Sequence, residues 1–182
     1  MELNSFLKLV EDNKRKIAQD YYEEVKNSDY MKTYHKLDAE KVIKREEATY
    51  DYLTAWIKNG AKNDETEKFF CNLGKERFKE GFPLSELNFA LYISKKAFYN
   101  FIKSHPEILD NMNKDEIIEF FTLISNYFAL AGFYMVRGYI NTLFDKLDLS
   151  DRLTREELQQ ILIRGAFDEE DLDFSDFVWR HV

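Results

Sequence analysis

The sequence predicts a single domain built only of α-helices, and three observations lead to this prediction. Its 182 residues include only 6 Gly and 2 Pro, too few for the many turns of a β-structure. Hydrophobic residues make up 45% of the chain and aromatic residues 16%, which is enough for one large core. Apolar residues also recur every three or four positions, the spacing of helices that bury one face.

The N-terminal third is expected to form two helices. The first ends near Asn27, and the stretch 28–36 is polar and without clear periodicity, so it is expected to be a loop or a short helical turn. Asp38 is then placed to cap a second helix, which ends at Asn59 because Gly60 follows. The apolar face of the first helix contains Phe6, Val10, Ile17, Tyr21 and Val25.

Two more helices are expected in the middle of the chain. The third begins around Asp64 and ends before Gly81. The fourth begins at Ser85, just after Pro83, and ends at His105, which precedes a proline. Its buried stripe is expected to contain Leu87, Leu91, Ser94, Phe98 and Ile102.

A long fifth helix is expected to run from the cap residue Asn113 to about Lys146, roughly 50 Å at 1.5 Å per residue. Apolar residues cover nearly all its faces, but polar residues leave an uninterrupted apolar run of only ten, where a membrane span needs about 20. Such a helix is expected to be buried on all sides, by other helices or by a second copy of the chain. Three small residues form the candidate homodimer interface: Ala129, Gly132 and Gly138.

The chain is expected to divide into a helical domain, residues 1–149, and a C-terminal segment, residues 150–182. Thr154 opens a capping box that predicts a short sixth helix to about Arg164. The last 15 residues alternate acidic and large apolar residues, a composition that favours a partner-binding tail, although these rings could instead pack on their own domain. Its expected anchors are Phe174, Phe177 and Trp179.

The residues that carry chemistry do not form a recognisable catalytic or metal-binding set. A single cysteine, Cys71, and three separated histidines give no zinc set, and no Glu-x-x-His pair, phosphate loop or Ser-His-Asp arrangement is present in the sequence. We therefore expect no enzyme activity, no cofactor and no catalytic or metal-ligating residue. The net charge of −8 and the scattered lysines argue against nucleic acid or an anionic membrane as a partner. The lone cysteine and the absence of a leader at Met1 favour the cytoplasm.

An apolar small molecule bound in the helical core is a second possibility. Tyrosines of the long helix, with Asn126 and Arg137, could form a polar notch in an apolar pocket, although tyrosines at helical spacing are more often core residues with satisfied hydroxyl groups. The candidate pocket residues are Phe120, Tyr127, Phe128 and Tyr134.

The segment 70–102 resembles the N-terminal domain of RsbR/RsbRD-type co-antagonist proteins, and related domains precede some bacterial sensor kinases and PucR-type regulators. The shared features are Gly74 within a helix, Gly81 seven residues later, and then Pro83, Leu84, Ser85 and Glu86 opening a long amphipathic helix. The resemblance extends over about residues 5–147.

This resemblance implies a globin-like or bundle-like helical sensor module, often dimeric and without catalytic residues, that passes a signal to a C-terminal output domain. In place of a STAS or kinase domain, this chain has only the short helix and the acidic tail. We therefore expect a stand-alone sensory or regulatory module of a bacterial signalling pathway, which acts by homodimerisation and by binding a protein partner. Binding of an apolar small molecule is the alternative.

Overall fold

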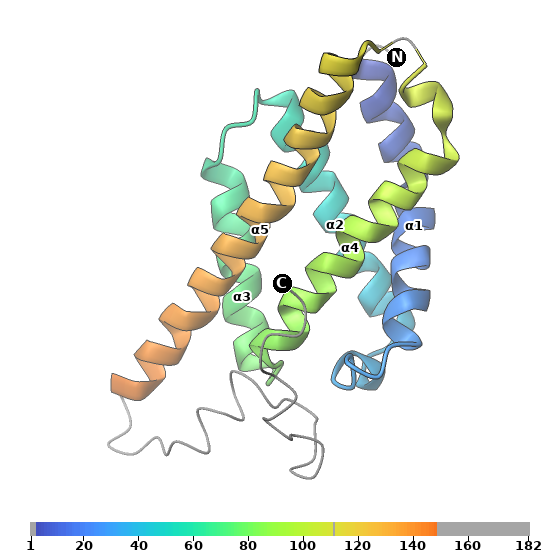
Figure 1. The fold of residues 1–182 in the computed structure, drawn as a ribbon. Helices are drawn as coiled ribbons and strands as arrows, with labels where there is room; N and C mark the ends of the chain where they lie inside the picture. The colour runs from blue at the N-terminus through green and yellow to red at the C-terminus, as the bar shows by residue number, and fades with distance from the viewer. Residues whose placement is uncertain (1–2, 111, 149–182) are drawn as a thin grey trace, which may run out of the picture.

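The computed structural model describes residues 3–110 and 112–148, and Figure 1 shows their arrangement. No strand occurs in this part of the chain, so the predicted all-α fold is confirmed. The predicted sixth helix and the tail residues Phe174, Phe177 and Trp179 lie outside the described residues. The described helices are α1 (Leu3–Lys26), α2 (Ala39–Lys58), α3 (Asp64–Lys79), α4 (Leu84–Ser104) and α5 (Lys114–Asp148), with short 3₁₀ turns η1 (Tyr34–Lys36) and η2 (Pro106–Ile108).

The helices pack in two connected groups. Helix α1 contacts both α2 and α4, while α3 lies along α5, the most extensive contact between two of these helices. Helix α5 crosses the molecule diagonally in Figure 1, with α3 beside its C-terminal half, and it also contacts α4. The face of α5 next to α4 is consequently one of the places where the two groups meet.

Side-chain caps fix the starts of α2 and α5. Asp38 accepts a hydrogen bond from the backbone N–H of Lys41, as its position before the second helix predicts. At α5, the Asn113 side chain accepts from the N–H groups of Asp115 and Glu116, and the Glu116 carboxylate accepts in return from the N–H of Asn113. This reciprocal cap satisfies donors that a helix start leaves unpaired.

The start of α4 differs slightly from the prediction. The helix begins at Leu84 rather than at Ser85, and the residue before it, Pro83, takes the extended conformation of an N-terminal flank (φ −65°, ψ 143°). Proline suits this place because its missing N–H would have no partner within the helix.

Two glycines bring α3 and α5 into direct backbone contact. A Cβ atom added at Gly74 would lie 2.0 Å from the carbonyl oxygen of Met135, and one added at Gly138 would lie 2.0 Å from that of Cys71. Any larger residue at these positions would force the helices apart. The prediction that Gly138 belongs to a homodimer interface is therefore corrected: Gly138 is buried against α3 of its own chain.

Aromatic side chains fill much of the core, and three of its tyrosines, Tyr50, Tyr127 and Tyr139, donate their hydroxyl hydrogens to backbone oxygens. Tyr127 donates to the carbonyl oxygen of Thr49 (2.6 Å), and Tyr139 donates to that of Phe82 (2.7 Å). The Tyr50 ring stacks on Phe98 with 5.6 Å between ring centroids. These bonds let large polar rings occupy the core without leaving a buried donor unsatisfied.

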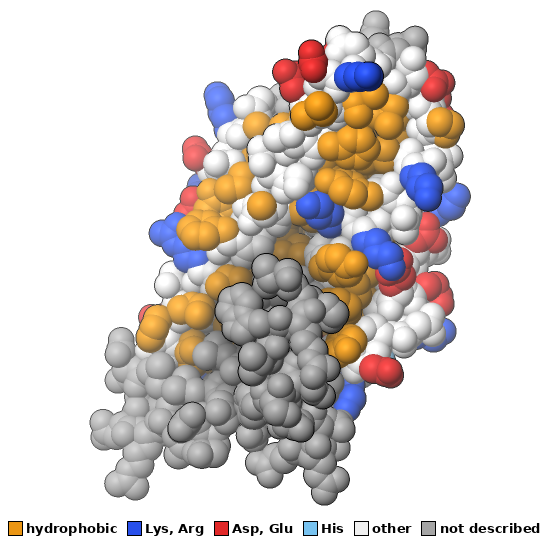
Figure 2. Space-filling view, viewed as in Figure 1, with side chains coloured by type: hydrophobic (Ala, Val, Ile, Leu, Met, Phe, Trp, Pro, Cys, Tyr) orange, Lys and Arg blue, Asp and Glu red, His pale blue; other side chains and the backbone are white. Residues whose placement is uncertain are grey.

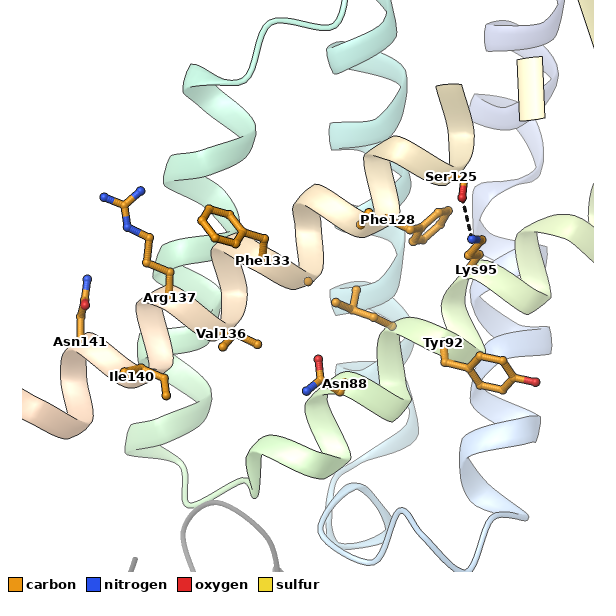
Figure 3. A pocket seen from close by; sticks show the side chains of 13 residues that line it. Asn88, Tyr92, Lys95, Ser125, Phe128, Phe133, Val136, Arg137, Ile140 and Asn141 are labelled. Atoms are coloured by element: carbon orange, nitrogen blue, oxygen red, sulfur yellow. Dashed lines mark hydrogen bonds between the residues drawn. The ribbon is translucent and has the colours of Figure 1, made fainter. Parts of the chain in front are cut away.

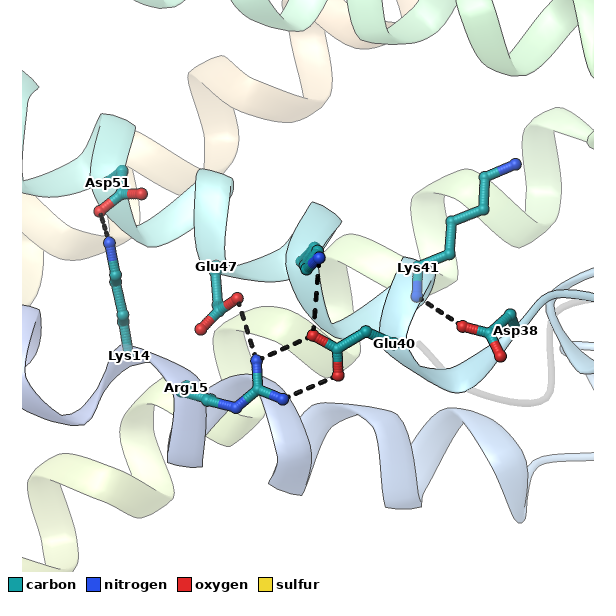
Figure 4. Close-up of polar contacts among 8 residues, drawn as sticks. Lys14, Arg15, Asp38, Glu40, Lys41, Glu47 and Asp51 are labelled. Atoms are coloured by element: carbon teal, nitrogen blue, oxygen red, sulfur yellow. Dashed lines mark hydrogen bonds and ion pairs between the residues drawn. The ribbon is translucent and has the colours of Figure 1, made fainter.

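Ion pairs join the outer faces of α1 and α2 (Figure 4). Arg15 makes two parallel hydrogen bonds to Glu40 (2.7 and 3.1 Å) and lies 3.6 Å from Glu47, while Lys14 pairs with Asp51 at 2.5 Å. The Arg15 hydrogen bond holds the pKa of Glu40 below its usual value. Because these pairs are largely exposed, each is expected to contribute little to the stability of the fold.

Within its own chain the long helix α5 is not buried on all sides, so of the two predicted covers the neighbouring helices supply only a part. By length and composition alone it could cross a membrane, but the core helices of many proteins pass the same test; 33% of its apolar window is buried within this chain. Ile118, Phe133 and Phe144 on this helix are between 57% and 63% exposed. The sequence pattern shows that the helix is apolar all round, but the chain itself covers only part of that surface.

Candidate functional site

An open groove of about 740 Å³ runs between α4 and α5 (Figure 3). Apolar side chains dominate its walls, and Figure 2 shows apolar side chains gathered along these two helices on the same face. Helix α4 contributes Asn88, Leu91, Tyr92 and Lys95. Helix α5 contributes Ser125, Phe128, Ala129, Gly132, Phe133, Val136, Arg137, Ile140 and Asn141.

The groove exists because α5 carries small residues opposite α4. Ala129 is exposed, and a Cβ atom added at Gly132 would have Leu91 Cδ1 at 3.7 Å as its nearest neighbour, which is an ordinary contact. These short side chains leave a depression where leucine or phenylalanine would have filled the space. Two of the three predicted interface residues, Ala129 and Gly132, therefore lie in the groove, whereas Gly138 does not.

Two exposed aromatic rings stand at the sides of the groove. Tyr92 on α4 is 59% exposed and stacks on Phe89 (5.6 Å between centroids). Phe133 on α5 is 60% exposed and meets the edge of Tyr134. Each of these rings packs on one neighbouring ring and exposes the rest of its surface, so both add apolar surface to the sides of the groove.

The charged groups of the groove are basic. Lys95 donates a hydrogen bond to Ser125 Oγ across the groove (2.9 Å) and lies over the Tyr99 ring (5.4 Å). Arg137 pairs with Glu67 of α3 (3.1 Å), and its side chain remains 52% exposed. None of the described lining residues is acidic, so the groove combines an apolar floor with a weakly positive rim.

The four residues predicted to form a ligand pocket are all buried, but they do not line one common pocket. Phe128 lines the inner wall of the groove. Phe120 packs edge-on against Phe6 (5.0 Å between centroids), and Tyr127 is tied to α2 through its hydroxyl. Tyr134 is 7% exposed and supports the ring of Phe133. Phe120 and Tyr127 are thus core residues in this fold.

The core also contains buried charged residues that were not predicted from the sequence. Glu46 on α2 is 6% exposed and Arg77 on α3 is 3% exposed. Burial raises the pKa of Glu46 to about 7, although hydrogen bonds with Ser94 and Tyr50 oppose the shift. One signal was present in the sequence: Glu46 falls four residues after Val42 and three before Thr49, on the apolar face of its helix.

Residues typical of metal or nucleophilic sites do not gather in the described part of the chain, which holds no group of three or more His, Cys, Asp or Glu suited to a metal ion. Cys71 is half-buried, and burial raises the pKa of its thiol, which disfavours the reactive thiolate. The arrangement is suited to binding an apolar surface.

Comparisons of the chain with protein-family models, with curated proteins and with solved structures found no match.

Proposed function

We propose that this protein is a non-catalytic regulatory module of a bacterial signalling pathway, which works in the cytoplasm by self-association and by binding a protein partner. The α4/α5 groove is the observation that carries the proposal. It is apolar and open, and the exposed rings of Tyr92 and Phe133 flank it. Large aromatic side chains on a preformed apolar surface are typical anchors of protein interfaces.

A second copy of the chain is the proposed occupant of this face. Helix α4 has 21 residues and so is about 30 Å long, and two adjacent helices, each about 10 Å wide, give a face of roughly 600 Å². The exposed residues Ile118 and Phe144, nearer the two ends of α5, would enlarge the apolar surface. This approaches the roughly 800 Å² per subunit of a standard stable interface. Ala129 and Gly132 would let the two α5 helices approach closely.

The C-terminal segment is proposed as the site for the protein partner. Its acidic and aromatic residues around Phe174, Phe177 and Trp179 would select a partner surface that combines apolar pockets with basic groups. The resemblance to sensor domains that pass a signal C-terminally supports this division of roles.

Light scattering at several protein concentrations tests the self-association. We expect a mass twice the 21.8 kDa of one chain at micromolar concentration, and a monomer mass for Phe133→Lys and Val136→Glu with unchanged helical circular dichroism. Leu3→Lys is the matched control, because Leu3 is a similarly exposed apolar residue that is not among the groove residues. A monomeric wild-type protein at 100 µM, or a dimer that survives both groove substitutions, contradicts the proposal.

An apolar small molecule is the second candidate occupant of the groove. Its volume of about 740 Å³ lies within the 300–1,000 Å³ usual for small-molecule pockets, and Phe128 provides an aromatic wall. Mass spectrometry under native conditions distinguishes the two candidates. A stoichiometric small-molecule adduct that Phe133→Lys removes, on a monomeric chain, would favour this function over self-association.

A further inference from the structure

The groove between α4 and α5 lies close to the point where the chain continues from α5 into residues 149–182. Along α5 the groove extends from Ser125 to Asn141 (Figure 3), about 24 Å at 1.5 Å per residue. Ser125, at its far end, is about 35 Å along the helix from Asp148, the last residue of α5. A later segment of the same chain that fills the groove must cover this distance.

The chain that follows Asp148 is long enough to do so. Phe174 comes 26 residues later in the sequence. Even if residues 154–164 form the predicted helix, which would be about 16 Å long, the reach of the extended chain is about 60 Å. Such a tether gives the attached segment an effective concentration of about a millimolar next to the groove. Weak contacts are then enough to keep the groove occupied.

The groove and the tail, residues 168–182, carry opposite charges. Lys95 and Arg137 are the charged residues that line the groove. The tail contains six carboxylates and one arginine, so it contributes −5 of the chain's net charge of −8. The acidic excess of the protein is therefore concentrated in one short segment, which is complementary to the basic rim of the groove.

The apolar parts of the groove and of the tail also match in size. Phe174, Phe177 and Trp179 span five positions of the sequence and so extend over at most about 17 Å, less than the length of the groove. A Cβ atom added at Gly132 would meet only Leu91 Cδ1, at 3.7 Å, so there is free space above the groove floor at this position. The volume of about 740 Å³ leaves room for several large side chains.

We propose that the tail docks in the α4/α5 groove of its own chain, with its three aromatic rings on the apolar floor and its carboxylates beside Lys95 and Arg137. Charge and tether together favour this segment as the occupant of the groove in the monomer. The tail is then both the segment that a partner binds and the cover of the face that self-associates.

This inference rests on the proposed function, because it gives the self-association face an internal competitor. Two copies pair through their grooves only after both tails have left. With about three docked tails for every free one, the dissociation constant of the dimer would be about sixteen times higher than without docking. A partner protein that captures the tail therefore promotes self-association.

The fluorescence of Trp179 in the full-length chain tests the docking. The chain has two tryptophans, and Trp56 is buried in the core, so the Trp179 signal is the difference between proteins with and without Trp179→Phe. In the monomer, identified by sedimentation velocity, we expect Val136→Glu to increase the quenching of Trp179 by acrylamide about twofold or more, because the ring loses its binding surface. Leu3→Lys, outside the groove residues, should not change it.

Two results of this measurement overturn the proposal. In the first, Trp179 of the monomeric wild-type protein is quenched as strongly as in urea. In the second, Trp179 is shielded, but Val136→Glu leaves the quenching unchanged, which would place the ring elsewhere on the protein.

The charge complementarity has its own matched pair of variants. Lys95 lines the groove, whereas Lys96 is not among its lining residues, and the Lys96 side chain is 48% exposed beside Glu24 of α1. Lys95→Gln should increase the quenching of Trp179, and so should added salt, since screening weakens the attraction. Lys96→Gln should have no effect. Equal quenching in the two variants overturns this placement of the tail.

Self-association gives the last test and separates this inference from the proposed function. The full-length double variant Phe174→Ser, Phe177→Ser should lower the dissociation constant of the dimer about tenfold, because its tail no longer competes. Phe167→Ser, an aromatic substitution just before the tail, is the matched control and should behave like wild type. Equal dissociation constants for the two overturn the proposal. Monomers of every form at 100 µM instead overturn the self-association, and the Trp179 measurement then decides the docking alone.

Discussion

Gly138 on α5 lies directly on the backbone of Cys71 on α3, with so little space that a single added methyl group would stand 2.0 Å from the Cys71 carbonyl oxygen. Alanine normally stabilises a helix relative to glycine by up to about 1 kcal/mol. Here we expect the opposite: Gly138→Ala should lower the free energy of unfolding by about 3 kcal/mol, because α3 and α5 must separate. Chemical denaturation measures the change.

Gly132 on the same helix is the control for this prediction. Its added Cβ would meet only Leu91 Cδ1, at 3.7 Å, so Gly132→Ala should be neutral or should stabilise the chain by up to about 1 kcal/mol. If Gly138→Ala is as stable as Gly132→Ala, then the backbones of α3 and α5 do not lie as close together at Gly138 as described.

The protonation of Glu46 should make stability depend on pH. Its pKa is raised from 4.5 to about 7 in the folded state, so between these values the folded protein holds a proton that the unfolded chain has lost. The stabilisation is fully present below pH 4.5 and is lost as pH rises towards 7. Relative to Glu46→Gln, wild-type protein should lose about 2 kcal/mol of unfolding free energy between pH 5 and pH 8. Equal pH profiles for the two proteins, measured by urea denaturation, would refute this assignment.

Glu86 should hold the segment before η1 against α4. This buried carboxylate accepts hydrogen bonds from both the N–H (3.1 Å) and the hydroxyl (2.9 Å) of Thr33. We expect Glu86→Ala to cost about 2 kcal/mol and to accelerate hydrogen exchange of the backbone amide at Thr33. The exposed Glu76→Ala on α3 should change neither quantity. Unchanged exchange at Thr33 in Glu86→Ala would show that these hydrogen bonds do not restrain the segment.

The C-terminal tail is expected to be dispensable for folding. Deletion of residues 168–182 should lower Tm by less than about 8 °C, the shift that roughly 2 kcal/mol produces in a domain of this size. A core segment would cost more, since each large buried side chain contributes about 1.5 to 3 kcal/mol. Differential scanning calorimetry decides between these outcomes, and a larger fall would identify Trp179 as a core residue.

Short-range sequence signals, such as cap residues and prolines, predicted the ends of the helices well. Asp38 and Asn113 cap α2 and α5 as their sequence positions indicate, and His105 ends α4 before a proline. Such signals act within a few residues, so one sequence is enough to interpret them.

The candidate site was predicted only in part, because it depends on which helices meet. The sequence shows that Gly132 and Gly138 are small, but not that one borders a groove while the other touches α3. Leu91 belongs to the predicted buried stripe of α4, yet it is only half-buried, because α5 leaves space beside it. The buried positions of Glu46 and Arg77 likewise depend on contacts among several helices.

Leu91 has one further consequence, because its side chain lines both the groove and a small cavity of about 40 Å³ that Glu46 and Arg77 also border. The two spaces are therefore neighbours, and Leu91 borders both. Protein interiors are close-packed, so a change in the contents of the cavity must be accommodated by the residues around it. A rotamer change of Leu91 would alter the depth of the groove next to Gly132, so the packing of the interior and the shape of the groove are linked through this one side chain.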